Sequence, residues 1–226
     1  FLFTERVATT GAHMIEQACE IVSAIDGEAL RAVPPLLPVD EYAETWCDQW
    51  LLKASEKAGP EARFILMNPG AGWGAKRWPA ERYGRVAAML HHLGYTIVVN
   101  TGPEEALLAE TVIMASGNIA VRLQCDLGRL IAMTRRTALM IAGDTGPLHL
   151  ACALGKPAVG IFGPTDPARN GPYSFGVSKY RVLRSPQSRR DHARRSDPEA
   201  GLLTITPQTV FEAADSLLHG AQRREP

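Results

Sequence analysis

The stretch that most constrains the fold is residues 138–167, where two apolar runs of strand length flank a short helix-like segment. The first run, 138–142, has the length of a strand and shows no helical period. It ends in Gly-Asp-Thr-Gly at 143–146, and Pro147 then stands where a first helical residue belongs, because its missing N–H is not needed there. A glycine and a proline end the helix before the second run, 158–162. The pattern predicts a strand–turn–helix–strand unit.

The polar residues of this unit lie at the carboxyl end of its first strand and the amino end of its helix. Open α/β sheets bind ligands at this position. Free N–H groups and the positive end of the helix dipole favour an anion there, typically a phosphate. Asp144, Thr145, Gly146 and His149 are therefore candidate binding residues. The alternatives are that Asp144 only caps the helix and that His149 is a core histidine.

Beyond residue 60, apolar runs alternate regularly with helix-like stretches. Such alternation implies an α/β domain with a parallel sheet and right-handed crossovers. The expected strands are 64–67, 96–99, 119–123, 138–142, 158–162 and 180–184, and the expected helices are 79–93, 104–116, 126–136, 147–154 and Pro207 to about Leu218.

The first sixty residues have a different organisation. A helical spacing over 13–25 is followed by a glycine, and prolines after residue 33 then predict a linker. We interpret 1–33 as the end of a preceding domain, 34–60 as a linker with a crossing helix over 41–58, and 61–226 as one domain. The crossing helix is expected to carry an apolar stripe of Tyr42, Trp46, Trp50 and Leu51. The chain begins without Met, so we expect it to be a fragment.

A second signal is the glycine-rich loop that follows the first strand of the regular region, at residues 68–79. Its three glycines let the backbone approach a ligand and direct N–H groups toward it. Lys76 and Arg77 add positive charge just before a helix, although Lys76 is also explained as a solvated loop residue. Because this loop and 144–149 both follow strands, they face one crevice if those strands lie close together. Together they would suit a diphosphate.

Two known nucleotide motifs fit this loop poorly. A P-loop needs Gly-Lys followed by Ser or Thr, whereas Ala75 precedes and Arg77 follows Lys76. The dinucleotide fingerprint is met by Gly70, Gly72 and Ala75, but the helix begins several residues too late. A nicotinamide-dependent oxidoreductase therefore stays as an alternative function.

An acidic pair follows the second expected strand, although the position expected for a dinucleotide-binding acid holds Asn100-Thr101. Glu104 or Glu105 can accept hydrogen bonds from a ribose diol. Alternatively, both acids only favour the positive end of a helix dipole.

Composition excludes several classes of protein. With 226 residues, 46% hydrophobic residues and zero formal net charge, the chain is an ordinary globular protein and not a dedicated nucleic-acid binder. Its four cysteines form no C-x-x-C pair, which argues against a zinc site or a disulfide framework and for a reducing compartment. No apolar run approaches the ~20 residues of a membrane span.

Four motifs occur in the order found in glycosyltransferase family 9, the lipopolysaccharide heptosyltransferases. They are Lys-Arg-Trp-Pro at 76–79, Gly-Pro-Glu-Glu at 102–105, Asp-Thr-Gly-Pro-Leu-His-Leu-Ala at 144–151 and Phe-Gly-Pro-Thr-Asp-Pro at 162–167. The chain resembles this family over about 64–218, the carboxyl-terminal half of its two-domain GT-B fold. The resemblance implies a Rossmann-like, donor-binding parallel sheet preceded by a remnant of the amino-terminal domain.

The resemblance also implies a donor site made of Lys76, Glu104, Asp144, Thr145, Gly146 and His149. Lys76 would contact the donor phosphates and stabilise the leaving group, and Glu104 would hold the ribose. Thr145 and Gly146 would bind the diphosphate, with Asp144 and His149 beside the sugar. Preorganised cations and N–H groups stabilise such a departing anion.

The implied reaction transfers heptose from ADP-heptose to a lipid-linked inner-core acceptor. It would invert the anomeric carbon and use no metal or other cofactor; the chain has no Asp-x-Asp pair. The catalytic base would belong to the part of the amino-terminal domain outside this chain. We expect a cytoplasmic protein, in peripheral contact with the inner membrane. A non-catalytic module that binds nucleotide-sugar is the other alternative.

Three further features have plain structural explanations. The basic run over 184–195 is interpreted as a solvated loop, or else as a contact for anionic lipid head groups. Thr165-Asp166 is interpreted as turn chemistry and is placed outside the site. Trp73 and Trp78 are interpreted as packing residues.

Overall fold

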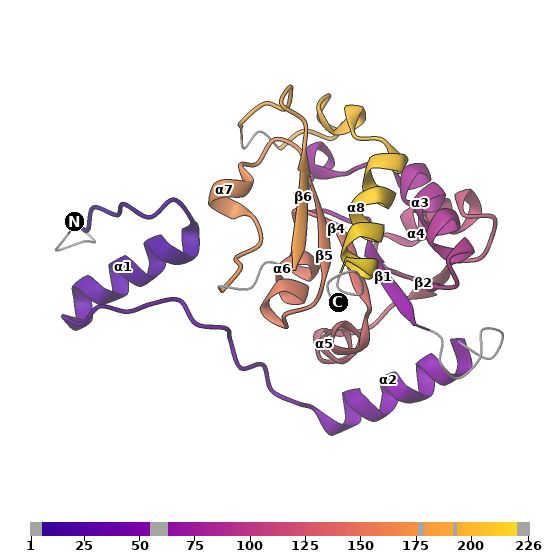
Figure 1. Ribbon diagram of the computed structural model, residues 1–226, viewed down its shortest axis with the longest axis horizontal. Coiled ribbons are helices and arrows are strands. Elements are labelled where there is room, and N and C mark those ends of the chain that lie inside the picture. Colours follow the sequence, from indigo (N-terminus) through magenta and orange to yellow (C-terminus); the bar gives the residue numbers. More distant parts are fainter. Residues whose placement is uncertain (1–5, 55–62, 176–178, 192–193, 221–226) are drawn as a thin grey trace.

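A six-stranded parallel sheet forms the centre of the computed structural model, which describes residues 6–54, 63–175, 179–191 and 194–220 (Figure 1). Every adjacent pair of strands runs in parallel. The sequence predicted all six strands. They are β1 (Phe64–Asn68), β2 (Thr96–Asn100), β3 (Val121–Leu123), β4 (Leu139–Gly143), β5 (Ala158–Phe162) and β6 (Tyr180–Arg184).

The strand order is β3-β2-β1-β4-β5-β6, so the chain reverses its direction of travel across the sheet between β1 and β4. These two strands are hydrogen-bonded neighbours, with Met67 opposite Ile141 and Asn68 opposite Ala142. In open α/β sheets, ligands bind outside the carboxyl ends of the strands at such a reversal point. The loops that follow β1 and β4 are the ones singled out from the sequence, and they leave the sheet side by side.

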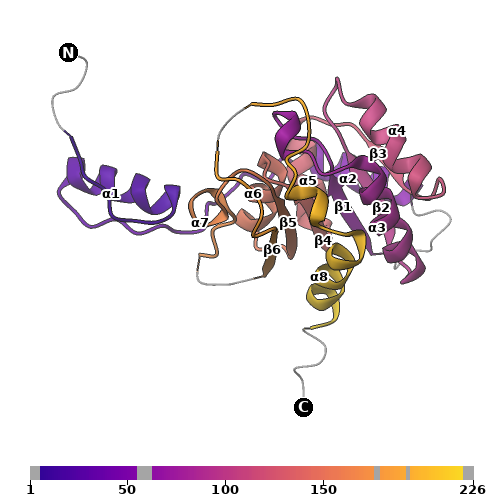
Figure 2. The same cartoon turned by 90° about the horizontal axis from the view of Figure 1, so that it is seen from above.

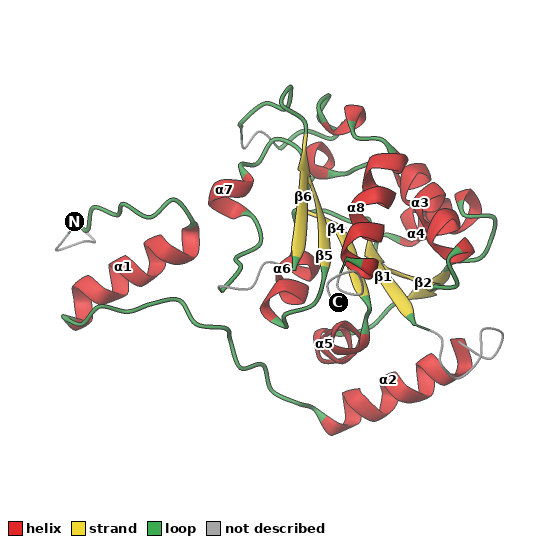
Figure 3. Ribbon diagram, viewed as in Figure 1, coloured by secondary structure: helices red, strands yellow, loops and turns green. Residues whose placement is uncertain are grey.

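Helices cover both faces of the sheet, as Figure 3 shows. One face is covered by α3 (Ala80–His92), α4 (Ala106–Ala115) and α8 (Pro207–His219), and the other by α2 (Glu41–Ala54), α5 (Leu127–Arg136) and α6 (Gly146–Ala153). The remaining short elements are η1 (Gly74–Lys76), α7 (Pro167–Asn170) and η2 (Leu202–Thr204).

The strands are apolar along almost their whole length because both of their faces are buried. Ile65 and Met67 of β1 point into the cluster beneath α3 and α8, whereas Phe64 and Leu66 point into the cluster beneath α5 and α6. Burying each such side chain stabilises the fold by about 1.5–3 kcal/mol. The two layers together hold the carboxyl edge of the sheet rigid.

The amino-terminal helix α1 (Met14–Asp26) lies to one side of the sheet domain in both views (Figures 1 and 2). It contains no buried residue. His13 caps it, with Nδ1 accepting a hydrogen bond from the Ile15 N–H at 3.1 Å. The other ring nitrogen, Nε2, lies 2.9 Å from the carbonyl oxygen of Gly171, which ties the helix start to the segment after α7. Gly27, with φ of +80°, ends the helix in the left-handed conformation.

Helix α2 packs on α5 with a different stripe from the one predicted. Tyr42 is 90% exposed, whereas Ala43 and Cys47 are buried. The prediction was wrong at Tyr42 because ion pairs set the rotation of the helix: Glu44 contacts Arg135 at 3.3 Å and also pairs with Arg136. Positions 55–58 of the predicted helix lie outside the described residues.

Within the described ranges, no helix is both long and apolar enough to cross a membrane.

Candidate functional site

The centre of the candidate site is an ion pair between the loops that follow β1 and β4. Lys76 Nζ lies 2.5 Å from Asp144 Oδ2, and only 13% and 7% of the two side chains are exposed. Lys76 belongs to η1, whose turn brings its side chain back over the end of β4. The two loops thus lie at the same edge of the sheet, as the sequence analysis required.

Asp144 is held as a carboxylate by three donors. Besides Lys76, Thr165 Oγ1 donates to Oδ2 at 2.8 Å, and His149 Nε2 lies 3.4 Å from Oδ1. Burial acts to raise the pKa of Asp144, but the hydrogen bonds from His149, Lys76 and Thr165 outweigh it and lower the pKa below its ordinary value. Asp144 is therefore ionised at neutral pH.

Thr165, which the sequence analysis placed outside the site, contacts the candidate residue Asp144. It follows β5, which is the neighbour of β4, and it is 2% exposed. Its position at the carboxyl end of an adjacent parallel strand was the signal available in the sequence. The turn interpretation holds for Asp166, whose side chain caps α7.

The start of α6 is open beside this ion pair. Thr145 is the N-cap residue, in extended conformation and without a side-chain capping bond. The alternative in which Asp144 caps the helix is thus wrong, since its carboxylate binds Lys76 and Thr165 instead. Gly146 is exposed, and nothing lies within 4 Å of the place where its Cβ would be. The first turn of α6 can therefore receive an anion.

A cavity of about 540 Å³, here called the Lys76 cavity, opens over the ion pair. Its residues come from the loops after β1, β4 and β5 and from the start of α1. They are His13, Met14, Ile15, Trp73, Lys76, Asp144, His149, Thr165 and Asn170. The side chain of His149 is 42% exposed, so it is not a core histidine.

A second cavity, of about 460 Å³ and here called the Thr145 cavity, adjoins the same turn. It is lined by the last residues of β1 and β2 and by residues that follow β1, β2, β3 and β4: Asn68, Gly70, Ala71, Gly72, Asn100, Thr101, Gly102, Glu105, Cys125, Asp126, Leu127, Leu130, Thr145 and Pro147. Thr101 is 3% exposed, and its hydroxyl has no hydrogen-bond partner in the described part of the chain. A buried hydroxyl without a partner is costly, so a bound ligand that pairs with it would be stabilised.

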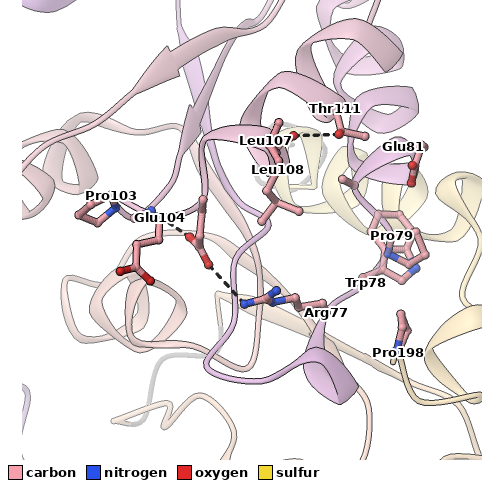
Figure 4. A pocket seen from close by; sticks show the side chains of 13 residues that line it. Arg77, Trp78, Pro79, Glu81, Pro103, Glu104, Leu107, Leu108, Thr111 and Pro198 are labelled. Atoms are coloured by element: carbon pink, nitrogen blue, oxygen red, sulfur yellow. Dashed lines mark hydrogen bonds and ion pairs between the residues drawn. The ribbon is translucent and has the colours of Figure 1, made fainter. Parts of the chain in front are cut away.

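The structure separates the two acids of the Gly-Pro-Glu-Glu motif. Glu104 is exposed and lines a third cavity of about 870 Å³ between the starts of α3 and α4, where Figure 4 shows it next to Pro103. Glu105 also borders that cavity, but in addition it lines the Thr145 cavity. Its carboxylate accepts the Gly102 N–H at 2.9 Å and lies 4.0 Å from Arg77.

Of the six residues predicted for the site, Lys76, Asp144 and His149 line one cavity, and Thr145 and Gly146 form the adjoining start of α6. Glu104 lies apart from them, in the third cavity. Its neighbour Glu105 is the acid that shares a cavity with Thr145.

The sequence model of glycosyltransferase family 9 (heptosyltransferase) matches residues 2–201. The chain belongs to this family. Its parallel sheet is the Rossmann-like α/β fold found in the family's solved GT-B structures.

Curated relatives in this family carry heptosyltransferase names. Lipopolysaccharide heptosyltransferase 2 of Escherichia coli K12 is 28% identical over 193 residues, which are 81% of this chain and 53% of that protein. The enzyme of the same name from Salmonella typhimurium is 30% identical over 211 residues, 88% of this chain and 60% of the relative. The chain thus spans little more than half the length of these family 9 relatives.

Solved structures of family 9 show the same architecture. The structure of E. coli ADP-heptose lps heptosyltransferase II superposes with a TM-score of 0.68 at 27% identity, over 83% of this chain and 54% of that one. A family 9 glycosyltransferase from Veillonella parvula superposes with a TM-score of 0.77 at 23% identity, over 96% and 63%.

The cysteines of this family 9 chain are free thiols. Burial raises the pKa of Cys47 and Cys152 to about 12 and that of Cys125 to about 11, so these thiols stay protonated. Over the described ranges, no three His, Cys, Asp or Glu side chains gather closely enough to hold a metal ion.

Proposed function

We propose that this chain carries the donor site of a heptosyltransferase that moves heptose from ADP-heptose to a lipopolysaccharide inner-core acceptor. Residues 61–226 would be the donor-binding domain, 34–60 the linker and crossing helix, and 1–33 a remnant of the acceptor domain. The observation that carries the proposal is the Lys76–Asp144 ion pair, which lies at the reversal point of the sheet beside the open start of α6.

The diphosphate of the donor would lie at the start of α6. There Thr145 and Gly146 offer backbone N–H groups and the positive end of the helix dipole. Lys76 has three N–H donors and gives one of them to Asp144, so two stay available for phosphate oxygens.

Lys76 would stabilise the charge that grows on the departing diphosphate. Removing one preorganised donor of this kind typically raises a barrier by about 3–4 kcal/mol. We propose an inverting displacement without a metal, in which this cation and the helix start bear the negative charge. The base that takes the proton from the acceptor hydroxyl would lie in the amino-terminal domain.

The heptose would occupy the Lys76 cavity. Asp144 is a carboxylate, so it can only accept hydrogen bonds, and sugar hydroxyls donate them. His149 stands beside it with an exposed ring edge that can reach either the sugar or the phosphate.

The nucleoside would occupy the Thr145 cavity, on the other side of the same turn. The unpaired hydroxyl of Thr101 and the carboxylate of Glu105 both border this cavity and can bind the ribose diol. Glu104, at the family motif position, is the other candidate for the ribose. Because Glu105 borders the Thr145 cavity and Glu104 does not, separate substitutions distinguish them.

Binding to the purified chain tests the proposal. Calorimetric titration with ADP-heptose and with NAD is expected to show clear binding of ADP-heptose and a much weaker response to NAD. A preference for NAD would instead support the oxidoreductase alternative that the Gly70, Gly72 and Ala75 fingerprint left open. Turnover by this chain alone would contradict the assignment of the base to another domain.

We also propose that the acceptor is lipid-linked and that the protein works in the cytoplasm at the inner membrane surface. A flotation assay with vesicles that contain anionic lipid tests the contact. Failure of the full-length enzyme to float with anionic vesicles would overturn it.

A further inference from the structure

The basic loop between β6 and η2 is anchored to the turn that carries Lys76. The Ala75 N–H donates to the carbonyl oxygen of Arg195 at 3.0 Å, and the Glu199 N–H donates to the carbonyl oxygen of Ala75 at 3.2 Å. A Cβ on Gly74 would lie 1.5 Å from the carbonyl oxygen of Ser196, so only glycine permits this close approach. The described residues of the loop therefore form a fixed wall beside η1.

A buried carboxylate holds the far end of the same loop. Glu199 is 3% exposed and accepts the N–H groups of Leu202 at 3.2 Å and Arg189 at 3.3 Å. Burial acts to raise the pKa of Glu199, but the hydrogen bonds from backbone N–H groups outweigh it and lower the pKa. The backbone of the described part of the loop is thus held at two points, by Ala75 and by Glu199.

Most arginines in this loop, and Arg184 at the end of β6 just before it, pair with nearby carbonyl oxygens or aspartates. Arg184 donates to the carbonyl oxygens of Gly163, Ser188 and Arg189. The ion pairs are Arg189 with Asp191 at 3.9 Å, Arg195 with Asp191 at 3.7 Å and Arg190 with Asp166 at 3.4 Å.

Arg194 is different because its guanidinium lies over an aromatic ring. Its Cζ is 5.6 Å from the ring centroid of Trp73, and no carboxylate pairs with it among the described residues. Lys76 Nζ lies 4.2 Å from the centroid of the same ring. Trp73 lines the Lys76 cavity, so both cations contact one side chain of its wall.

The residues assigned so far to the donor site supply less positive charge than the diphosphate of the donor carries negative charge. Asp144 offsets the charge of Lys76, since the two side chains are in contact. A sugar nucleotide brings more than one negative charge on its diphosphate, and another develops as the bond to the sugar breaks. A second cation at this edge would help to balance them.

We propose that Arg194 is a donor-binding residue, which joins Lys76 in holding the diphosphate while the indole of Trp73 supports its guanidinium. This inference rests on the donor assignment above and extends it to a loop that the sequence analysis interpreted as solvated. The guanidinium can bind two phosphate oxygens at once and stacks on the ring at little cost in entropy.

Titration of the purified chain with ADP and with AMP tests the proposal. Arg194→Gln is expected to weaken ADP binding about tenfold, the loss of one charge-assisted contact, and to weaken AMP binding less. Arg190→Gln is the matched control: it removes the same charge from the same loop, but its partner is Asp166. It should change ADP affinity less than twofold.

Three results would decide against this assignment. Equal ADP affinity in Arg194→Gln and Arg190→Gln would overturn the role of Arg194 while leaving the donor site intact. No ADP binding by the unchanged chain would overturn the donor site and this inference together. An equal loss of ADP and AMP affinity would show that the loop acts on the nucleoside instead of the diphosphate.

A second variant keeps the test decisive if Arg194→Gln perturbs the loop. Arg194→Lys retains the charge but loses the planar fork, so its ADP affinity should lie between those of the unchanged chain and Arg194→Gln. The advantage of the unchanged chain over Arg194→Gln should also shrink as salt is raised, because the contact is partly exposed. An advantage that does not change with salt would contradict a direct ionic contact.

Discussion

Two clusters of ion pairs in this protein have similar ingredients and different surroundings. One joins Lys76 to Asp144 at the carboxyl edge of the sheet, and the other joins Glu44 of α2 to Arg135 and Arg136 of α5. In both, side chains at most about one quarter exposed connect segments that are far apart in sequence. A partly buried ion pair is therefore not a functional site by itself.

The difference lies in what surrounds each pair. Arg136 also binds Asp48 and the carbonyl oxygen of Ala132, so its N–H groups are largely used within the protein. Lys76 has spare donors, a cavity above it and the open start of α6 beside it. Unused hydrogen-bonding capacity next to an empty volume is what marks the first cluster as a place for a ligand.

The largest expected difference between the two ion-pair clusters is the effect that substituting their cations has on donor binding. Lys76→Met should weaken ADP-heptose binding by about 100-fold, because it removes the cation that we propose to bind the diphosphate in a partly dry site. Arg136→Met should leave that affinity within twofold. Calorimetric titration measures both values.

A double variant controls for damage to the fold. Lys76→Met leaves Asp144 buried without its partner, so the combination of Lys76→Met with Asp144→Asn should regain stability without regaining affinity. Equal affinities in Lys76→Met and Arg136→Met would remove the distinction between the clusters.

The next effect concerns the ribose. Glu105→Gln should weaken binding of ADP about tenfold, since its carboxylate shares the Thr145 cavity with Thr101. Glu104→Gln, the neighbouring matched change, should have little effect. A larger loss of ADP affinity in Glu104→Gln than in Glu105→Gln, measured by the same titration, would assign the ribose to Glu104, the family motif position.

The α2–α5 cluster should show its effect in stability. Burial disfavours the charge on Arg136, yet hydrogen bonds from Arg136 to Asp48 and Glu44 raise its pKa above the ordinary value, so it stays charged. Arg136→Met should lower the free energy of unfolding by about 1–2 kcal/mol, discounted for the partial exposure of the pair. Urea unfolding followed by circular dichroism measures it, and an unchanged midpoint would show that α2 is held by apolar packing alone.

The smallest effect is a pH dependence at Asp144. Because the folded pKa is lowered, the unfolded chain binds the proton more readily, and the carboxylate stabilises the fold above its unfolded pKa of about 3.9. This contribution is lost as the pH falls through the folded pKa. The stability gap between the unchanged chain and Asp144→Asn should therefore be full at pH 6 and close below pH 4 in unfolding titrations. A gap that widens in acid would contradict the sign of the shift.

Local patterns predicted most of the fold because each element carries its own signal. Pro147 and Gly155 bracket α6, and apolar runs without helical period became the buried strands. The loops of Lys76 and Asp144 were correctly expected to meet, since both follow parallel strands.

What could not be predicted depends on contacts between distant residues. Thr165 reaches Asp144 across 21 positions, and the rotation of α2 is set by arginines some 90 positions away. Glu104 and Glu105 are adjacent in sequence, yet Glu105 borders the Thr145 cavity and Glu104 does not, which no periodicity reveals. The place of Arg194 depends on the close approach of Ser196 to Gly74.

The two ring nitrogens of His13 have a consequence for proton transfer. Although this imidazole borders the Lys76 cavity, its Nδ1 accepts a hydrogen bond from the Ile15 N–H and its Nε2 lies 2.9 Å from the carbonyl oxygen of Gly171. To take a proton from an incoming hydroxyl, the ring would first have to uncap α1. His13 thus joins the start of α1 to the segment after α7, and both of its ring nitrogens are engaged in that contact.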